Sequence, residues 1–178
     1  MGNKYSDQPV ETGTNTPAVA RPTHKAEGLS EREQKAIRIS WKKISSELKI
    51  NGRDFFVKFF EFYPVYIDYF PAFRGKSIED LCRSRLVQAH GISVMYSFTT
   101  LVENLNDPGF FNKFMVRNMR AHEGRGVALQ QYEEIFDVLI LFLEEKLGAR
   151  FDEFTRAANE RTWEHFARNG RREHRATD

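Results

Sequence analysis

Apolar side chains recur along this chain at helical intervals, beginning at Leu29. Beyond that point large hydrophobic residues are spaced three and four positions apart, which puts them on one face of an α-helix. The first such run consists of Ile37, Trp41, Ile44 and Leu48. No segment alternates apolar and polar residues over the length of a strand. The pattern therefore predicts an all-α fold of roughly six to eight helices.

Capping residues and helix breakers set the expected ends of these helices. Ser30 with Glu33, and again Ser77 with Asp80, have the spacing at which a hydroxyl and a carboxylate satisfy free amides at a helix start. Asn51-Gly52 is expected to end the first helix. The predicted helices span about 31–50, 53–63, 80–104, 108–123, 129–147 and 152–168, with a helical turn opening at Pro64 and a loop over 70–76.

The two ends of the chain differ in composition from this helical part. Residues 1–28 are rich in Pro, Thr, Gly and Asn and poor in large apolar side chains, so we expect a disordered tail. Residues 29–170 are expected to form one domain. Residues 171–178 contain three Arg and are expected to form a solvated basic C-terminal tail after the last helix. Lys and Arg are favoured near the C-terminal end of a helix, so this basic stretch needs no further function.

Composition and charge narrow the class of protein. Hydrophobic residues make up 40% of the 178 residues, and the 16 Phe provide for an aromatic core. The net charge of +2 comes from interspersed acidic and basic residues, so no nucleic-acid partner is expected. No apolar run reaches the roughly 18–20 residues that span a bilayer, and no segment near Met1 has the apolar stretch of a secretory signal, so we expect neither a membrane span nor secretion. Cys82 is the only cysteine, which fits a reducing compartment, and we therefore expect a cytoplasmic location.

Two histidines fall on the apolar faces of neighbouring predicted helices. His90 is in register with Val87 and Val94, and His122 is in register with Met119. A single histidine on such a face is more often a core residue that bonds to backbone groups. A facing pair is costly to bury without partners, because each unsatisfied polar group costs about 1–3 kcal/mol. A metal between the two imidazoles would satisfy both.

The available donors favour haem iron over zinc. Structural zinc takes four protein ligands, and Cys82 lies too far along the helix from His90 to serve as a third. A porphyrin supplies the equatorial nitrogens of its iron and leaves only the axial positions to the protein. An aromatic all-α core with two inward histidines therefore suits haem b (iron protoporphyrin IX) better than zinc.

Several landmarks stand in a fixed order along the chain: Leu29-Ser30 with Trp41, the segment 54–60, Pro64, Phe70, Phe73, His90 to Val94, Ala121-His122 and Tyr132. With these landmarks the sequence from Leu29 to residue 170 resembles the globin family. The resemblance implies a globin fold that encloses a haem. The interval between the histidines and the N-terminal tail are similar to those of neuroglobin-like and globin X-like members. Asn118 departs from the family pattern, since globins commonly carry Leu four residues before the proximal His.

The resemblance also implies a role for each residue of the pocket. His122 would coordinate the iron as a neutral imidazole, with its other ring nitrogen donating to a carbonyl or side chain. His90 would either donate a hydrogen bond to a bound gas or bind the iron as a second axial ligand. Around the ring, Phe56 would form the distal ceiling, Phe70 and Phe73 would stack on and wall the porphyrin, Val94 would limit ligand approach, Val127 would pack beneath it, and Arg125 would either pair with a propionate or be solvated.

The function that the resemblance implies is reversible binding of dioxygen or another diatomic gas, for storage, transport or sensing. The alternative is a haem redox enzyme at a membrane surface, acting as a nitric oxide dioxygenase, a nitrite reductase or a peroxidase-like protein with a reductase partner. A third reading is a haem-free helical interaction module. The sequence offers no Ser–His–Asp set, P-loop or paired carboxylates, so any catalysis would belong to the iron. We expect a monomer or a homodimer.

The first residues carry a separate motif. Met1-Gly2-Asn3-Lys4-Tyr5-Ser6 fits the N-myristoylation pattern, in which Gly2 is acylated after Met removal. An unacylated tail is the alternative. One myristoyl chain binds membranes weakly, at about 10⁴ M⁻¹, and no cysteine near Gly2 can take a second acyl group. The motif therefore predicts weak, reversible association with the cytoplasmic face of a membrane.

Overall fold

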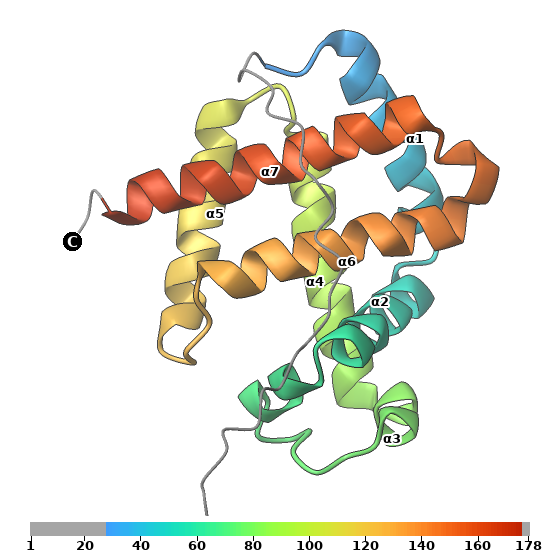
Figure 1. The fold of residues 1–178 in the computed structure, drawn as a ribbon, viewed down its shortest axis with the longest axis vertical. Coiled ribbons are helices and arrows are strands. Elements are labelled where there is room, and N and C mark those ends of the chain that lie inside the picture. The colour runs from blue at the N-terminus through green and yellow to red at the C-terminus, as the bar shows by residue number, and fades with distance from the viewer. Residues whose placement is uncertain (1–27, 176–178) are drawn as a thin grey trace, which may run out of the picture.

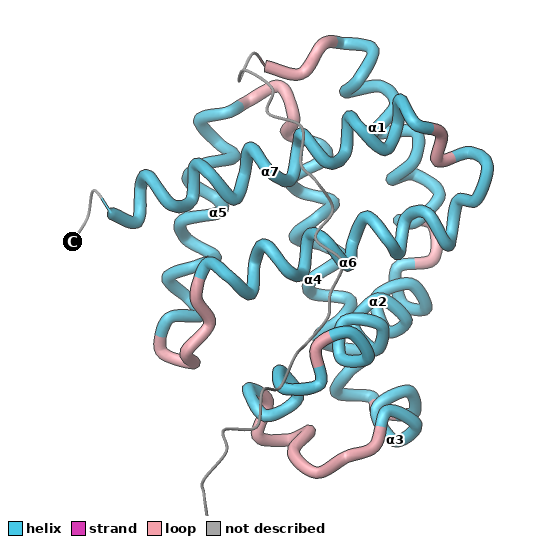
Figure 2. Tube along the Cα trace, viewed as in Figure 1, coloured by secondary structure: helices cyan, strands magenta, loops and turns pink. Residues whose placement is uncertain are grey.

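The structure, a computed structural model, describes residues 28–175, and side chains as far as residue 165. Gly2 and the rest of residues 1–27, which make up nearly all of the predicted disordered tail, lie outside the described residues. Within the described residues the chain forms helices joined by loops and contains no strand, as Figures 1 and 2 show, which confirms the predicted all-α fold. No helix in this range combines the length and apolarity needed to cross a bilayer. In chain order the elements are α1 (Glu31–Ser45), α2 (Leu48–Phe62), the 3₁₀ helix η1 (Pro64–Tyr69), α3 (Ile78–Arg83), α4 (Arg85–Glu103), α5 (Pro108–Glu123), α6 (Leu129–Leu147), the 3₁₀ turn η2 (Gly148–Arg150) and α7 (Glu153–Arg175).

Caps confirm the predicted helix starts at Ser30, Ser77 and Asp107. The amide of Ser30 donates to the Glu33 carboxylate at 2.9 Å, and the Ser30 hydroxyl accepts from the Glu33 amide. Ser77 and Asp80 repeat this box at the start of α3. Asp107 Oδ1 accepts the amide of Phe110 at 2.9 Å at the start of α5. Each cap satisfies an amide that the first turn of a helix leaves free.

The predicted break at Asn51-Gly52 is wrong, because these residues lie inside α2. The chain leaves α1 at Ser46 instead, and the Asn51 side-chain amide donates to the carbonyl of Ile44 at 2.8 Å. Gly52 is required for close packing, since a Cβ at that position would lie 2.7 Å from the carbonyl carbon of Gly91. Glycine therefore brings α2 and α4 together here, and it ends no helix.

Two further boundaries differ from the predictions. The expected helix over 80–104 is divided at Ser84, whose backbone is extended (φ −75°, ψ 123°) and whose hydroxyl accepts the amide of Val87 at 3.4 Å. Serine suits both a helix interior and an N-cap, so the spacing of apolar residues does not reveal this break. The last helix continues to Arg175, past its predicted end near Arg168.

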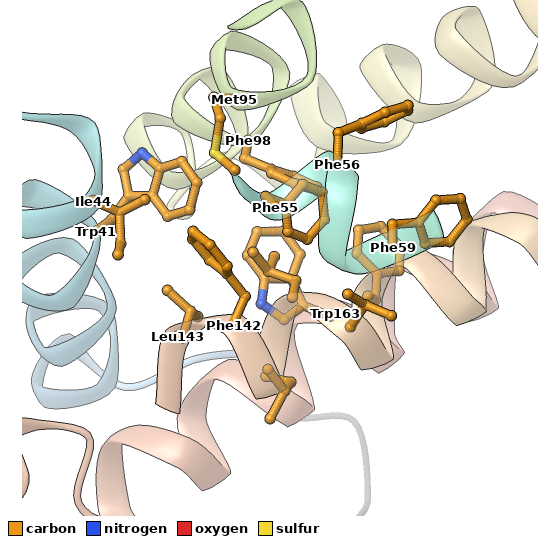
Figure 3. Close-up of a cluster of buried hydrophobic side chains, with 14 of the residues drawn as sticks. Trp41, Ile44, Phe55, Phe56, Phe59, Met95, Phe98, Phe142, Leu143 and Trp163 are labelled. Atoms are coloured by element: carbon orange, nitrogen blue, oxygen red, sulfur yellow. The ribbon is translucent and has the colours of Figure 1, made fainter. Parts of the chain in front are cut away.

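Aromatic rings fill the core where α1, α2, α4, α6 and α7 meet (Figure 3). The Phe98 ring meets the edge of Trp41 at 5.9 Å and of Phe55 at 5.6 Å. Phe55 also contacts Phe142, with ring centroids 5.5 Å apart. In Figure 3 Phe55 points into this cluster, whereas Phe56, the next residue of α2, points away from it. Helix α2 therefore supplies adjacent side chains to two different regions.

Candidate functional site

A cavity lies beside this core, bounded by α2, η1, α4, α5 and α6. The cavity and its open mouth together enclose about 1000 Å³ free of protein atoms. Most of its wall is aromatic or aliphatic, and no Asp, Glu, Lys or Arg is among the lining residues of the described chain. Of the residues predicted for the site, the structure brings Phe56, Phe70, His90, Val94, His122 and Val127 to this wall.

Phe73 and Arg125 lie outside the lining. Phe73 is 3% exposed and stacks on Phe70, with ring centroids 5.1 Å apart and planes 22° apart. The Phe73 amide donates to the Phe70 carbonyl at 2.8 Å, so the chain turns there and Phe73 packs behind the wall instead of forming it. Arg125 is exposed in the turn after α5.

Hydrogen bonds to its own helix and to α6 hold the His122 ring. Nδ1 of His122 lies 2.8 Å from the carbonyl oxygen of Asn118, one turn earlier in α5. A carbonyl can only accept, so Nδ1 is the donor in this bond, and Nε2 is the ring nitrogen left for a ligand. The Tyr132 hydroxyl lies 3.2 Å from the same Nδ1 and donates to Asn118 Oδ1 at 2.8 Å. Burial raises the pKa of Tyr132, so its phenol is neutral.

Asn118 therefore has a positioning role that the sequence analysis missed. The family pattern marks it only as a departure, yet its backbone oxygen accepts from His122 and its side-chain oxygen accepts from Tyr132. An amide side chain one turn before a histidine on an apolar face was the available signal. Its partner Tyr132 lies on another helix, which spacing along one helix does not reveal.

His90 enters the cavity from α4 between two phenylalanine rings. Its ring meets Phe56 at 4.6 Å and 67°, and Phe70 at 5.0 Å and 74°. No residue of the described chain hydrogen-bonds to either ring nitrogen. Burial, followed by the positive charges of His122 and Arg125, lowers the pKa of His90 to about 4. The imidazole is therefore neutral at neutral pH and keeps a lone pair for a ligand.

Tyrosines form a polar edge of the cavity that the sequence analysis also missed. Tyr66 stacks on Phe59, with centroids 5.5 Å apart, and its hydroxyl donates to the Glu134 carboxylate. Gln131 Nε2 donates to the Tyr66 hydroxyl at 3.0 Å. Burial and the bond to Glu134 raise the pKa of Tyr66 to about 12. Tyr69, three positions further along, lines the cavity as well, and a spacing of three is the period of a 3₁₀ helix.

This arrangement suits a flat, largely apolar group with a metal at its centre. His90 and His122 both reach the cavity with their imidazole rings, from different helices. Among the described residues no cluster of three or more His, Cys, Asp or Glu could hold a metal ion alone. The protein therefore offers axial donors without equatorial ones, which is the donor set that a metalloporphyrin requires.

Comparisons with known proteins agree with this geometry. The Globin family model matches residues 53–169, more than half of the chain. A globin of Nerita albicilla is 31% identical over 130 residues, covering 73% of this chain and 83% of that protein. Globin-1 of Liolophura japonica is 24% identical over 136 residues, covering 76% and 92%. The crystal structure of ferric Aplysia limacina myoglobin in different liganded states has the same fold, with a TM-score of 0.73 at 23% identity over 81% of this chain and 97% of that one.

The family match and the cavity lead to one assignment. The resemblance inferred from the landmarks between Leu29 and residue 170 is confirmed at the level of the family. Haem is the cofactor that this family and this donor set have in common. The chain therefore belongs to the globin family, as a haem protein that binds a small gas.

Proposed function

We propose that this globin binds dioxygen or another diatomic gas reversibly, with haem b held through His122 and with His90 on the opposite side of the ring. The haem iron would supply the atom to which the gas binds. The observation that carries the proposal is the hydrogen bond in which His122 Nδ1 donates to the Asn118 carbonyl at 2.8 Å, which leaves Nε2 as the nitrogen available to a metal. Storage, transport and sensing all require such a pocket.

The bonds of His122 prepare it as an axial ligand. Donation from Nδ1 to a carbonyl fixes the tautomer and makes Nε2 a better donor to a metal. Tyr132 restrains the same edge of the ring and holds the Asn118 side chain. The orientation of the imidazole is therefore set by the protein alone.

His90 is proposed to occupy the second axial position when no gas is bound. Support comes from a neutral ring with no hydrogen-bonding partner among the described residues, held between Phe56 and Phe70. The other role open to His90 is donation of a hydrogen bond to the bound gas. Val94, one turn further along α4, lines the same wall and would limit how closely a ligand approaches.

Haem redox chemistry is the second candidate function. It comprises nitric oxide dioxygenation, nitrite reduction or a peroxidase-like reaction, each with a reductase as electron donor. The observation that favours it is the same unpartnered His90 ring, because a protein ligand that must leave first slows gas entry without hindering electron transfer.

Visible absorption spectra of the haem-loaded protein, reduced with dithionite, test both roles of His90. We expect sharp, split low-spin bands in the wild type and broad high-spin bands in His90→Leu. Gln88→Leu, on the same helix but outside the cavity lining, is the matched control and should match the wild type. A wild-type spectrum that is already high-spin would reject axial ligation by His90. Failure to bind haem at all would reject the whole proposal.

A further inference from the structure

We propose that the outward face of α1 is a docking surface for an anionic lipid bilayer. This inference is independent of the gas-binding proposal. In Figure 1 α1 (blue) begins at the top of the view and passes behind α7. The face, called here the α1 outer face, consists of the exposed residues Lys35, Ile39, Lys42 and Lys43. Arg32, whose guanidinium lies over the Phe154 ring of α7, and half-buried Arg38, which donates to Gln34, flank it.

Helical geometry gathers these residues opposite the buried side of α1. Ile37, Trp41 and Ile44 point into the core, so residues displaced by about half a turn face solvent. Lys35, Lys42 and Lys43 are exposed. The cations are interleaved with core residues along the sequence, which is why the sequence analysis found no concentrated basic face.

The acidic residues of α1 do little to neutralise this face. The Glu33 side chain is only 14% exposed and pairs with Arg161 of α7, so it is turned toward the domain. Glu31, the other acid of the helix, is exposed one turn before Lys35, so this side of α1 carries one acid against three lysines. Lys35, Lys42 and Lys43 form no ion pair with any described residue. Their positive charges are therefore available to a partner.

Ile39 distinguishes a bilayer from other anionic partners. Its side chain is 63% exposed in the middle of the basic face. Basic residues that surround an exposed apolar side chain match the interface of an anionic membrane, where the cations meet headgroups and the apolar group enters the acyl boundary. The phosphate backbone of a nucleic acid would bind the basic side chains but would leave the Ile39 side chain exposed to water.

The position of α1 is compatible with an acylated N-terminal segment on one side and with an accessible cavity on the other. It is the first described helix after the segment that carries the Gly2 motif, and one acyl chain needs a second signal for stable anchoring. No residue of α1 is among those that line the cavity. A bilayer held against the α1 outer face would supply the second signal and leave the cavity free.

Sedimentation of the full-length, haem-loaded chain with lipid vesicles tests the proposal. Vesicles of phosphatidylcholine with and without phosphatidylserine are compared, for the chain with and without an N-myristoyl group. Each basic side chain near an anionic bilayer strengthens binding about fivefold, so Lys35→Glu with Lys42→Glu should weaken binding by at least about tenfold. The control is Lys113→Glu with Arg117→Glu, two exposed residues of α5 that change the net charge equally.

Ile39→Ser gives a second measure that preserves charge. We expect binding to fall by a few-fold, whereas Leu86→Ser, which alters a residue of similar exposure on α4, should have no effect. Binding of the wild type should require phosphatidylserine and weaken with added salt. Equal losses in the α1 and α5 charge variants would overturn the proposal, as would binding that depends on the acyl chain alone. Preference for duplex DNA over the vesicles would also overturn it.

Discussion

The aromatic core and the cavity wall are both built mainly from phenylalanine and other apolar side chains. They differ because the cavity also holds histidine rings whose nitrogens face a ligand site. Phe55 and Phe56 are adjacent in α2 and nearly inaccessible, at 0% and 2% exposure. Phe55 packs among Phe98 and Phe142 in the core, whereas Phe56 packs against His90 at the cavity. Two consecutive residues of α2 therefore belong to the two different regions.

The difference shows how one helix serves stability and function separately. In the core, aromatic rings pack edge to face and stabilise the fold through dispersion and through burial of apolar surface. At the cavity, Asn118 and Tyr132 hold the polar ring of His122 by one edge and leave the other edge free for a ligand. Substitutions in the core should therefore change the unfolding free energy most, and substitutions at the cavity should change haem binding most.

The largest effect on stability is expected from Phe55→Ala. Removal of a fully buried ring costs about 3–5 kcal/mol of unfolding free energy. Phe56→Ala should cost less in the apoprotein, because part of its surroundings is already cavity, but should change the haem spectrum more. Urea unfolding of both apoproteins measures this, and equal losses at the two positions would remove the distinction between the regions.

Gly91→Ala should come next, because α2 and α4 touch at this point. A Cβ there would lie 2.2 Å from the carbonyl oxygen of Gly52, which is backbone and can yield only if the helices move apart. Overpacking of this kind costs about 1–3 kcal/mol. Gly124→Ala is the control, since a Cβ there meets open space. Thermal unfolding that shows Gly91→Ala as stable as Gly124→Ala would contradict the helix crossing.

Tyr132→Phe tests the hydrogen bonds behind His122. Loss of the hydroxyl should cost about 0.5–1.5 kcal/mol, because Asn118 Oδ1 loses its donor while the backbone bond to His122 remains. Haem should bind several-fold more weakly, as measured by hemin transfer to an acceptor apoprotein. Tyr96→Phe, at 59% exposure, should change neither quantity. A Tyr132→Phe protein that retains haem like the wild type would show that Tyr132 does not position the ligand.

The smallest effect is expected from Asp54→Asn at the edge of the core. Burial raises the pKa of Asp54, but hydrogen bonds from Lys146 at 2.8 Å and from Arg53 outweigh burial and hold the pKa below its ordinary value. The folded state then binds protons less readily than the unfolded chain. The contribution of the Asp54 ion pairs to the unfolding free energy is therefore present above about pH 4 and is lost as the pH falls through the pKa of Asp54 in the folded state.

Since the pair is partly exposed, Asp54→Asn should lower the unfolding free energy at pH 7 by less than about 1 kcal/mol. It should also flatten the fall in stability below pH 4. Asp68→Asn, on the exposed side of η1, is the control for unfolding at pH 7. An unchanged acid limb in Asp54→Asn would contradict the role of the ion pairs.

The sequence predicted what depends on local spacing. The caps at Ser30 and Ser77 and the inward faces of His90 and His122 follow from periods that a helix imposes. What depends on contacts between elements was not predictable. Gly52 was taken for a helix breaker because its partner Gly91 lies in another helix.

Other misses have the same physical origin. Phe73 turns behind Phe70 because of a loop hydrogen bond, which no periodicity describes. The bond from Tyr132 to Asn118 joins α6 to α5. The basic face of α1 was hidden because its cations alternate with buried residues in the sequence.

Titration of the apoprotein with hemin, for the wild type and His122→Gly, tests the central claim that Nε2 of His122 holds the haem. We predict that the wild type binds hemin tightly, that His122→Gly binds it far more weakly, and that added imidazole restores the wild-type absorption bands. Imidazole should have that effect because it replaces the missing ring in the space beside Asn118 and Tyr132. A His122→Gly protein that binds hemin with wild-type affinity and an unchanged spectrum, with or without imidazole, would contradict the account.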